Sequence, residues 1–324
     1  MPVRPTRLYL QMVAALLGLL VVTVGFVVGV WAVFALLFAS FEVDAPGIVA
    51  LVPAVVTLIA IAGLEYVQRG TVERLADAHP VDHEAAPELY ETTTRIAAQL
   101  DVPVPTIAVS DRDAPEALVV GYRPSDVHLV LSLGTIEALE PAELEAVIAH
   151  ELAHVRNRDA MVMTAVSVPV VLADGLRSRL TAIENPGWGV IVVVPLGLVS
   201  SVVWVLGRTI TARLARVRER AADRTAAEVT GSPAALAGAL ERLDREIAET
   251  PERDLREVSG VSSLSILPLT PDEPEKVMLG PEGDVEPAYW RARTLLHRLE
   301  RWLFESHPPT EQRLEALAAM QRER

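Results

Sequence analysis

The sequence predicts a mostly α-helical integral membrane protein, with a four-segment helical membrane region and an α+β domain. Two observations lead to this prediction. The 324-residue chain is 51% hydrophobic, yet its formal net charge is −14. A chain that is both apolar and acidic must segregate the two properties, with apolar residues in a membrane and charges in water. The apolar residues also come in long uncharged runs, as bilayer-crossing helices require.

Two uncharged runs lie near the N-terminus, Leu8–Phe41 and Gly47–Leu64, and a short acidic link separates them. A membrane-spanning helix needs about 20 apolar residues. The first run exceeds this length and is too long for the apolar part of a cleaved signal peptide. The second run, of 18 residues, is just sufficient. Pro53 predicts a kink in that second span.

Two further apolar runs follow later, Ala160–Ala173 and Pro186–Gly207. The run that begins at Ala160 is too short to span alone, so it either extends a preceding helix at a tilt or is re-entrant. We therefore expect four membrane segments. Arginine-rich flanks fall on one side of such a chain, which predicts that this side is cytoplasmic. The flanking arginines are Arg4, Arg7, Arg69, Arg74, Arg208, Arg213, Arg216, Arg218, Arg220 and Arg224.

Between the two membrane hairpins we expect an amphipathic helix at Glu88–Leu100 and short strands at Thr106–Val109 and Val127–Leu131, with a turn at Gly121–Ser125. The Pro- and Glu-rich segment Pro268–Pro287 is predicted to be a loop or a mobile flap. The expected division of the chain is a two-span hairpin at 1–70, a first water-exposed part at 71–159, a second membrane hairpin at 160–207 and a second water-exposed part at 208–324.

The most specific signal is the stretch AVIAHELAHVRNRD, which contains the pattern H-E-x-x-H. Pro141 and Glu143 predict a helix start upstream. Residues four apart lie on one face of a helix, so His150 and His154 can bind one metal ion. Glu151 lies beside that ion, where a carboxylate can take a proton from water. The chain has no cysteine, so any further ligand must be His or a carboxylate.

A third ligand can come from the helical stretch RVRERAADRTAAEV, in which Glu219 and Asp223 are four residues apart. Glu219 could complete the metal site, and Asp223 could accept the ring N–H of a ligating His and fix its orientation. On composition alone, an exposed charged helix with Glu–Arg pairs is the simpler interpretation.

Three motifs together resemble the HtpX-type membrane zinc metalloproteases, relatives of the CAAX prenyl endopeptidases. They are HELAHVRNRD at 150–159, R-x-x-E-x-x-A-D at 216–223 and HPPTEQRLEAL at 307–317. The resemblance implies a zincin-like α+β metalloprotease domain built from 71–159 and 208–324. It implies one Zn²⁺ per chain bound by His150, His154 and Glu219, with Glu151 as the general base.

The third motif adds two residues to the predicted site. His307 precedes two prolines, which predicts a rigid corner before a helix at Glu311–Met320, and the resemblance implies that His307 donates to the oxyanion formed from the scissile carbonyl. Without the resemblance, a His at a helix entry is a reasonable alternative. Arg313 is expected to be a structural partner of the metal ligands.

One segment departs from the family pattern. Family members carry an Asn-Ala-Phe-Ala-like edge strand along the cleft, where this chain has PEALVVG at 115–121. Ala117 and Leu118 are the predicted substrate-binding residues, through main-chain pairing with an extended peptide. Glu116 stands where the family has Asn, which puts side-chain recognition at this point in question.

These observations predict a zinc-dependent membrane endopeptidase that acts at the cytoplasmic face on misfolded or membrane proteins, as part of protein quality control. The expected partners are polypeptide substrates and the lipid bilayer. The acidic chain argues against nucleic-acid binding, and no P-loop sequence suggests a nucleotide. Three alternatives are a zinc-binding membrane scaffold without turnover, a prenyl-protein CAAX-type protease, and an intramembrane site-2-type protease.

Overall fold

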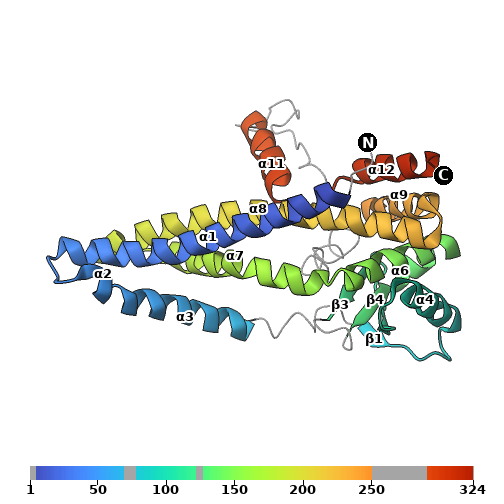
Figure 1. Cartoon of the computed structure of the whole chain (residues 1–324), viewed down its shortest axis with the longest axis horizontal. Coiled ribbons are helices and arrows are strands. Elements are labelled where there is room, and N and C mark those ends of the chain that lie inside the picture. The colour runs from blue at the N-terminus through green and yellow to red at the C-terminus, as the bar shows by residue number, and fades with distance from the viewer. Residues whose placement is uncertain (1–4, 69–77, 122–126, 250–289, 324) are drawn as a thin grey trace, which may run out of the picture. The chain divides into compact units, whose positions relative to one another are not determined.

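The computed structural model describes residues 5–68, 78–121, 127–249 and 290–323, which are mostly helical with one small sheet (Figure 1). The chain folds into two compact units, each built from segments far apart in the sequence. The sheet unit comprises the described residues within 74–160 and 215–324. The apolar-helix unit comprises residues 3–73 and 161–214.

The apolar-helix unit holds long helices that lie side by side (Figure 1). Four helices of the described chain are long and apolar enough to cross a membrane, which confirms the predicted mostly α membrane protein. The helices that supply this unit are α1 (Pro5–Ser40), α2 (Pro46–Val49), α3 (Leu51–Gln68), α7 (Asp159–Thr181) and α8 (Val190–Thr230), with a short 3-10 turn, η3 (Gly187–Gly189), before α8.

Side chains from these helices pack into one core that includes Phe26, Val30, Ile61, Leu176 and Val203. Many other apolar side chains of the same helices point away from that core and are largely exposed. These include Leu20, Val21, Leu36, Val52, Ile59 and Leu198. A helix that is apolar on all sides is suited to lipid around a packed interior, because lipid does not penalise exposed apolar surface.

The helices differ from the expected segments in three places. The third segment does not end at Ala173, because α7 continues to Thr181 and is 23 residues long. The fourth apolar run and the charged stretch after it form one continuous helix, α8, of 41 residues. In the second segment the helix has a one-residue break at Ala50, three residues before the predicted kink at Pro53. Pro53 lacks the N–H that would bond the carbonyl of residue 49, which accounts for a break just upstream.

The sheet unit contains a four-stranded sheet with strand order β1-β2-β4-β3. Its strands are β1 (Ala78–Pro80), β2 (Thr106–Ser110), β3 (Ala117–Val120) and β4 (His128–Ser132). The two predicted strands are confirmed as β2 and β4, and they pair in parallel with Ile107 opposite Leu129. β3 pairs antiparallel with β4 and forms one edge of the sheet. The predicted turn falls mostly on residues 122–125, which lie outside the described residues, as does Pro268–Pro287.

Helices cover the sheet and share one core with it. The helices found only in this unit are α4 (Pro87–Leu100), α5 (Leu133–Ala138), α6 (Pro141–Arg156), α9 (Pro233–Glu249), α11 (Trp290–Phe304) and α12 (Thr310–Arg322). The helices predicted at 88–100 and 311–320 are confirmed as α4 and α12. The core joins Ile96 of α4, Leu131 of β4, Leu152 of α6, Leu236 of α9 and Leu317 of α12. α6 is therefore held on several sides.

Candidate metal centre

Helix α6 positions the H-E-x-x-H residues. Pro141 is its first residue, and Glu140 and Glu143 form a reciprocal capping box in which the Glu140 N–H donates to Glu143 Oε2 at 3.0 Å. This satisfies N–H groups that a helix start leaves unpaired. The stretch from Ala146 to Ala153 is buried throughout. Because the helix start is capped and this stretch is buried, the side chains of His150 and His154 have defined positions.

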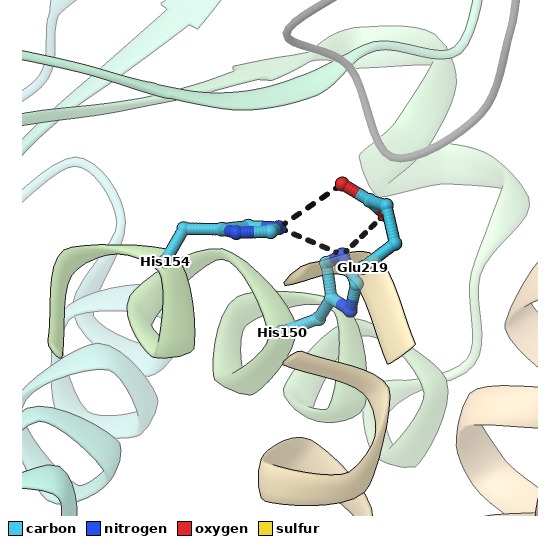
Figure 2. Close-up of side chains that lie close together, drawn as sticks. All are labelled: His150, His154 and Glu219. Carbon is cyan, nitrogen blue, oxygen red and sulfur yellow. Dashed lines mark hydrogen bonds and ion pairs between the residues drawn. The ribbon is translucent and has the colours of Figure 1, made fainter. Parts of the chain in front are cut away.

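The two histidines of α6 meet a carboxylate from α8. Figure 2 shows His150, His154 and Glu219 directed toward one another. His150 Nε2 and His154 Nε2 are 3.2 Å apart. Glu219 Oε2 lies 3.5 Å from His150 Nε2, and Glu219 Oε1 lies 3.5 Å from His154 Nε2. These three residues form a group whose ligand atoms could hold one metal ion.

The spacing of these atoms matches tetrahedral zinc. Zinc binds His nitrogen and carboxylate oxygen at about 2.0–2.2 Å, which places two tetrahedral ligand atoms roughly 3.3–3.5 Å apart. The two Nε2 atoms are 3.2 Å apart and each lies 3.5 Å from a different oxygen of Glu219, so each separation is close to that value. Glu219 Oε2 is buried without a hydrogen-bond partner among the described residues. Two imidazole nitrogens that face each other beside such a carboxylate can hold a cation between them, so the donor set fits zinc.

The other ring nitrogen of His150 faces a buried ion pair. His150 Nδ1 lies 3.0 Å from Asp223 Oδ1. Arg313 donates to the same carboxylate through Nη2 at 2.6 Å and Nε at 2.9 Å. Arg313 is only 1% exposed. Asp223 and Arg313 thus occupy the positions expected of residues that orient a ligating His, and their role remains a prediction.

His154 has an equivalent partner that the sequence analysis missed. His154 Nδ1 lies 2.6 Å from Asp159 Oδ2, and Arg218 forms an ion pair with the other oxygen of Asp159. Asp159 was visible in the first motif, but Arg158 between the helices has φ 56, a turn that periodicity alone does not predict. In the sequence, only its position directly before Glu219 indicates that Arg218 lies near the metal centre.

Among the groups of the centre, His150 and Glu151 have pKa values far from their ordinary ones. Burial favours the neutral form of His150, but the carboxylates of Asp223 and Glu219 outweigh burial and raise the pKa of His150 to about 9. Glu151 is 2% exposed. Its burial raises its pKa to about 7, although the charges of His150 and His154 oppose the shift. A carboxyl group with a pKa near neutrality can both take up and release a proton at physiological pH.

His307 reaches the same centre from the segment between α11 and α12. Its Nδ1 lies 3.7 Å from Glu219 Oε2, which is too long for a hydrogen bond. The residue is 4% exposed, and neither ring nitrogen has a hydrogen-bond partner among the described residues. Upstream, Arg216 donates to the carbonyl of Glu305 at 2.5 Å, which ties this segment to α8. His307 therefore has ring nitrogens available for another ligand.

The predicted substrate segment lies on the edge strand β3. Ala117 and Leu118 are fully buried, so β3 can offer a peptide its main chain but not these two side chains. Glu116 is fully buried as well and pairs with Arg112 at 3.2 Å. Its burial raises the pKa of its carboxyl group. The side chain that replaces the family Asn is thus used in a local ion pair, and substrate binding at β3 remains a prediction.

Comparison with known proteins identifies the family. The sequence pattern of peptidase family M48 matches residues 83–321. The chain belongs to peptidase family M48. It is 39% identical over 181 residues to Protease HtpX homolog 1 of Streptomyces coelicolor, a match that covers 54% of the chain and 59% of that relative. It is 37% identical over 190 residues to Protease HtpX homolog 2 of Methanosarcina acetivorans, covering 55% of the chain and 62% of that relative.

The fold of this M48 chain also matches a solved structure. The crystal structure of Ste24p from S. mikatae aligns with a TM-score of 0.50 and 16% identity, covering 96% of this chain and 67% of Ste24p. At this identity the likeness concerns the fold alone. The matches to the HtpX homologues span about three fifths of those relatives. The predicted family is confirmed, as is the membrane-protein fold class.

Proposed function

We propose that the protein is a zinc-dependent membrane endopeptidase that hydrolyses peptide bonds of misfolded or membrane proteins. The observation that carries this proposal is the triangle of His150, His154 and Glu219, whose ligand atoms have the separations of tetrahedral zinc. Membership of family M48 supports a peptidase. One Zn²⁺ per chain would act as a Lewis acid on the scissile carbonyl and lower the pKa of a water molecule.

In this mechanism Glu151 moves the protons. Its carboxylate takes a proton from the water whose oxygen attacks the carbonyl carbon, and it later delivers that proton to the leaving amine as the C–N bond breaks. A pKa of about 7 suits both steps. His307 lies near Glu219, and its ring nitrogens have no hydrogen-bond partner within the described part of the chain, so it can donate to the negative oxygen that develops on the attacked carbonyl.

The edge strand β3 supports an extended substrate. Its inner side pairs with β4, and no other described strand pairs with its outer side, so the main-chain groups of Ala117–Val120 on that side can accept an added strand. An extended peptide can add to such an edge through main-chain hydrogen bonds, which recognise no particular sequence. This suits substrates that are unfolded locally and agrees with a role in quality control and stress response.

We place the active site at the cytoplasmic face of the cell membrane. The four apolar helices support a multi-pass membrane protein, and the arginines that flank them on one side support a cytoplasmic orientation. The centre is built from the helix ahead of α7 and from the last part of α8. Its ligands therefore lie next to these flanks in the sequence.

The test is cleavage of an unfolded model protein by the full purified chain in detergent. Wild type is compared with Glu151→Gln, before and after a chelator and again after added zinc. The proposal predicts cleavage by wild type only, lost with chelator and restored by zinc, while Glu151→Gln keeps its zinc. Binding of one zinc per chain without cleavage by either protein would refute the peptidase and favour the scaffold. Cleavage by Glu151→Gln at the wild-type rate would refute the role of Glu151.

A further inference from the structure

Helix α11 is amphipathic, and its apolar residues gather on one face. In the sequence WRARTLLHRLERWLF, Leu295, Leu299 and Trp302 recur at intervals of four and three residues, with Leu296 beside them. This spacing places all four side chains on one side of the helix. The opposite side carries Thr294, His297 and Arg301.

The apolar face of α11 points away from the protein. Leu295, Leu296 and Trp302 are 69%, 61% and 62% exposed, and Leu299 is 48% exposed. On the polar side, Thr294, His297 and Arg301 are only half-exposed. This is the reverse of the usual arrangement of a helix on a water-soluble domain, which turns its apolar stripe inward. A contiguous apolar surface of this kind marks a site of contact with a membrane or another molecule.

The charge of α11 is opposite to that of the whole protein. The helix holds four arginines and one glutamate, a formal charge of +3, within a chain of formal charge −14. Arg293 and Arg298 lie at the two borders of the apolar face and are exposed. Long arginine side chains at such borders can keep their stems on apolar groups and direct their guanidinium groups toward phosphates.

We propose that α11 lies along the surface of an anionic lipid bilayer, with its apolar face at the boundary of headgroups and acyl chains. A helix of 15 residues is about 22 Å long, which is too short to cross the roughly 30 Å hydrocarbon core. Exposed leucine and tryptophan on one face with arginine at the borders are typical of interfacial helices. The candidate membrane-spanning helices of the same chain bring a bilayer within reach.

This contact goes beyond the proposed peptidase and does not depend on it. The end of α11 is nevertheless close to the candidate metal centre, because Phe304 is three residues from His307 and Glu305 is tied to Arg216 of α8. Lipid binding by α11 would therefore hold the segment that carries His307 at a defined distance from the bilayer surface.

The test uses the absence of cysteine from the chain. Leu299→Cys places a single spin label on the apolar face, and Glu300→Cys places one at the neighbouring exposed position, outside that face at its polar border. The full chain, with Glu151→Gln to prevent self-cleavage, is reconstituted into vesicles of phosphatidylglycerol and phosphatidylcholine, or of phosphatidylcholine alone. Collision of each label with oxygen, which partitions into lipid, is compared with collision with a water-soluble nickel chelate.

In anionic vesicles we expect the label at 299 to meet oxygen freely, while its collisions with the nickel chelate fall roughly tenfold below those of the label at 300. The difference should shrink in phosphatidylcholine and with Arg293→Glu added. Equal access of nickel to both labels would overturn the proposal. Exclusion of both reagents from position 299 would also overturn it, because the face is then covered by protein. Dilution with unlabelled chain would identify a second copy as that cover.

Discussion

The two histidines of the metal centre make the same kinds of contact, but their side chains differ in burial. Each presents Nε2 to Glu219 and Nδ1 to an aspartate, and each aspartate pairs with an arginine. The side chains of His150 and Arg313 are fully buried, whereas the side chain of His154 is 19% exposed. His150 is thus held from α8 and α12, elements distant in sequence, while the aspartate that holds His154 is only five residues away.

This difference predicts different roles for the two aspartate–arginine pairs. The chain Arg313–Asp223–His150 joins three helices, so it connects the centre to the packing of the whole sheet unit. The pair Arg218–Asp159 fixes one ring beside a helix start. We call the set His150–Asp223–Arg313 the His150 branch and the set His154–Asp159–Arg218 the His154 branch. We expect changes in the His150 branch to affect folding and metal binding together. Changes in the His154 branch should affect mainly metal binding.

The largest effect is expected where the two branches meet. Glu219→Ala removes the carboxylate that faces both Nε2 atoms, so zinc content should fall from one per chain to near zero, and peptide hydrolysis with it. Zinc is measured by elemental analysis of the purified chain. Glu228→Ala, an exposed position on the same helix, is the matched control and should keep full zinc. Zinc retained by Glu219→Ala would assign the third ligand elsewhere.

The next effect concerns stability in the His150 branch. Arg313→Ala leaves the buried Asp223 carboxylate without its bidentate partner, which costs about 3–5 kcal/mol, measured as a shift of the denaturant unfolding midpoint. Arg220→Ala is a control across the same two helices, because Arg220 contacts Gln312 at 3.2 Å in an exposed position. It should cost under about 1 kcal/mol. Equal costs for the two variants would contradict the distinction between the branches.

A smaller effect is expected in the His154 branch. Asp159→Asn keeps the size of the side chain but weakens the contact with His154 Nδ1, and such changes lower metal affinity about 10–100-fold. Competition with a coloured chelator gives the zinc dissociation constant. The unfolding midpoint should move less than with Arg313→Ala, because Asn keeps a side-chain oxygen that can accept from the buried Arg218. An Asp159→Asn variant that binds zinc as wild type does would leave that aspartate without a role in the centre.

The smallest effect is a pH dependence that distinguishes the two rings. Without metal, His150 has a pKa of about 9, whereas burial lowers the pKa of His154. Below pH 9, zinc must therefore displace one proton, from His150, and binding should weaken as pH falls, about tenfold per pH unit. Chelator competition between pH 7 and 8.5, in the Glu151→Gln background, measures this slope. A slope of two protons would mean that both rings are protonated.

Local rules predicted much of this centre from the sequence. His150 and His154, and again Glu219 and Asp223, are pairs four residues apart that one helical turn brings to one face. The residues that contact these side chains from other helices are not determined by this four-residue spacing. The chain changes direction at Arg158, whose backbone is left-handed, so the position of Asp159 depends on tertiary structure. The continuity of α8 was also missed, because its apolar and charged halves differ in composition although nothing in the sequence interrupts the helix.

The most direct test of the central claim is X-ray absorption at the zinc edge on the purified chain. The claim that His150, His154 and Glu219 bind one zinc predicts two imidazole nitrogens and carboxylate or water oxygen at about 2.0–2.2 Å. His154→Ala should reduce the imidazole count to one, and Glu219→Ala should abolish the bound zinc. A spectrum without imidazole scattering, or one unchanged by these substitutions, would contradict the assignment.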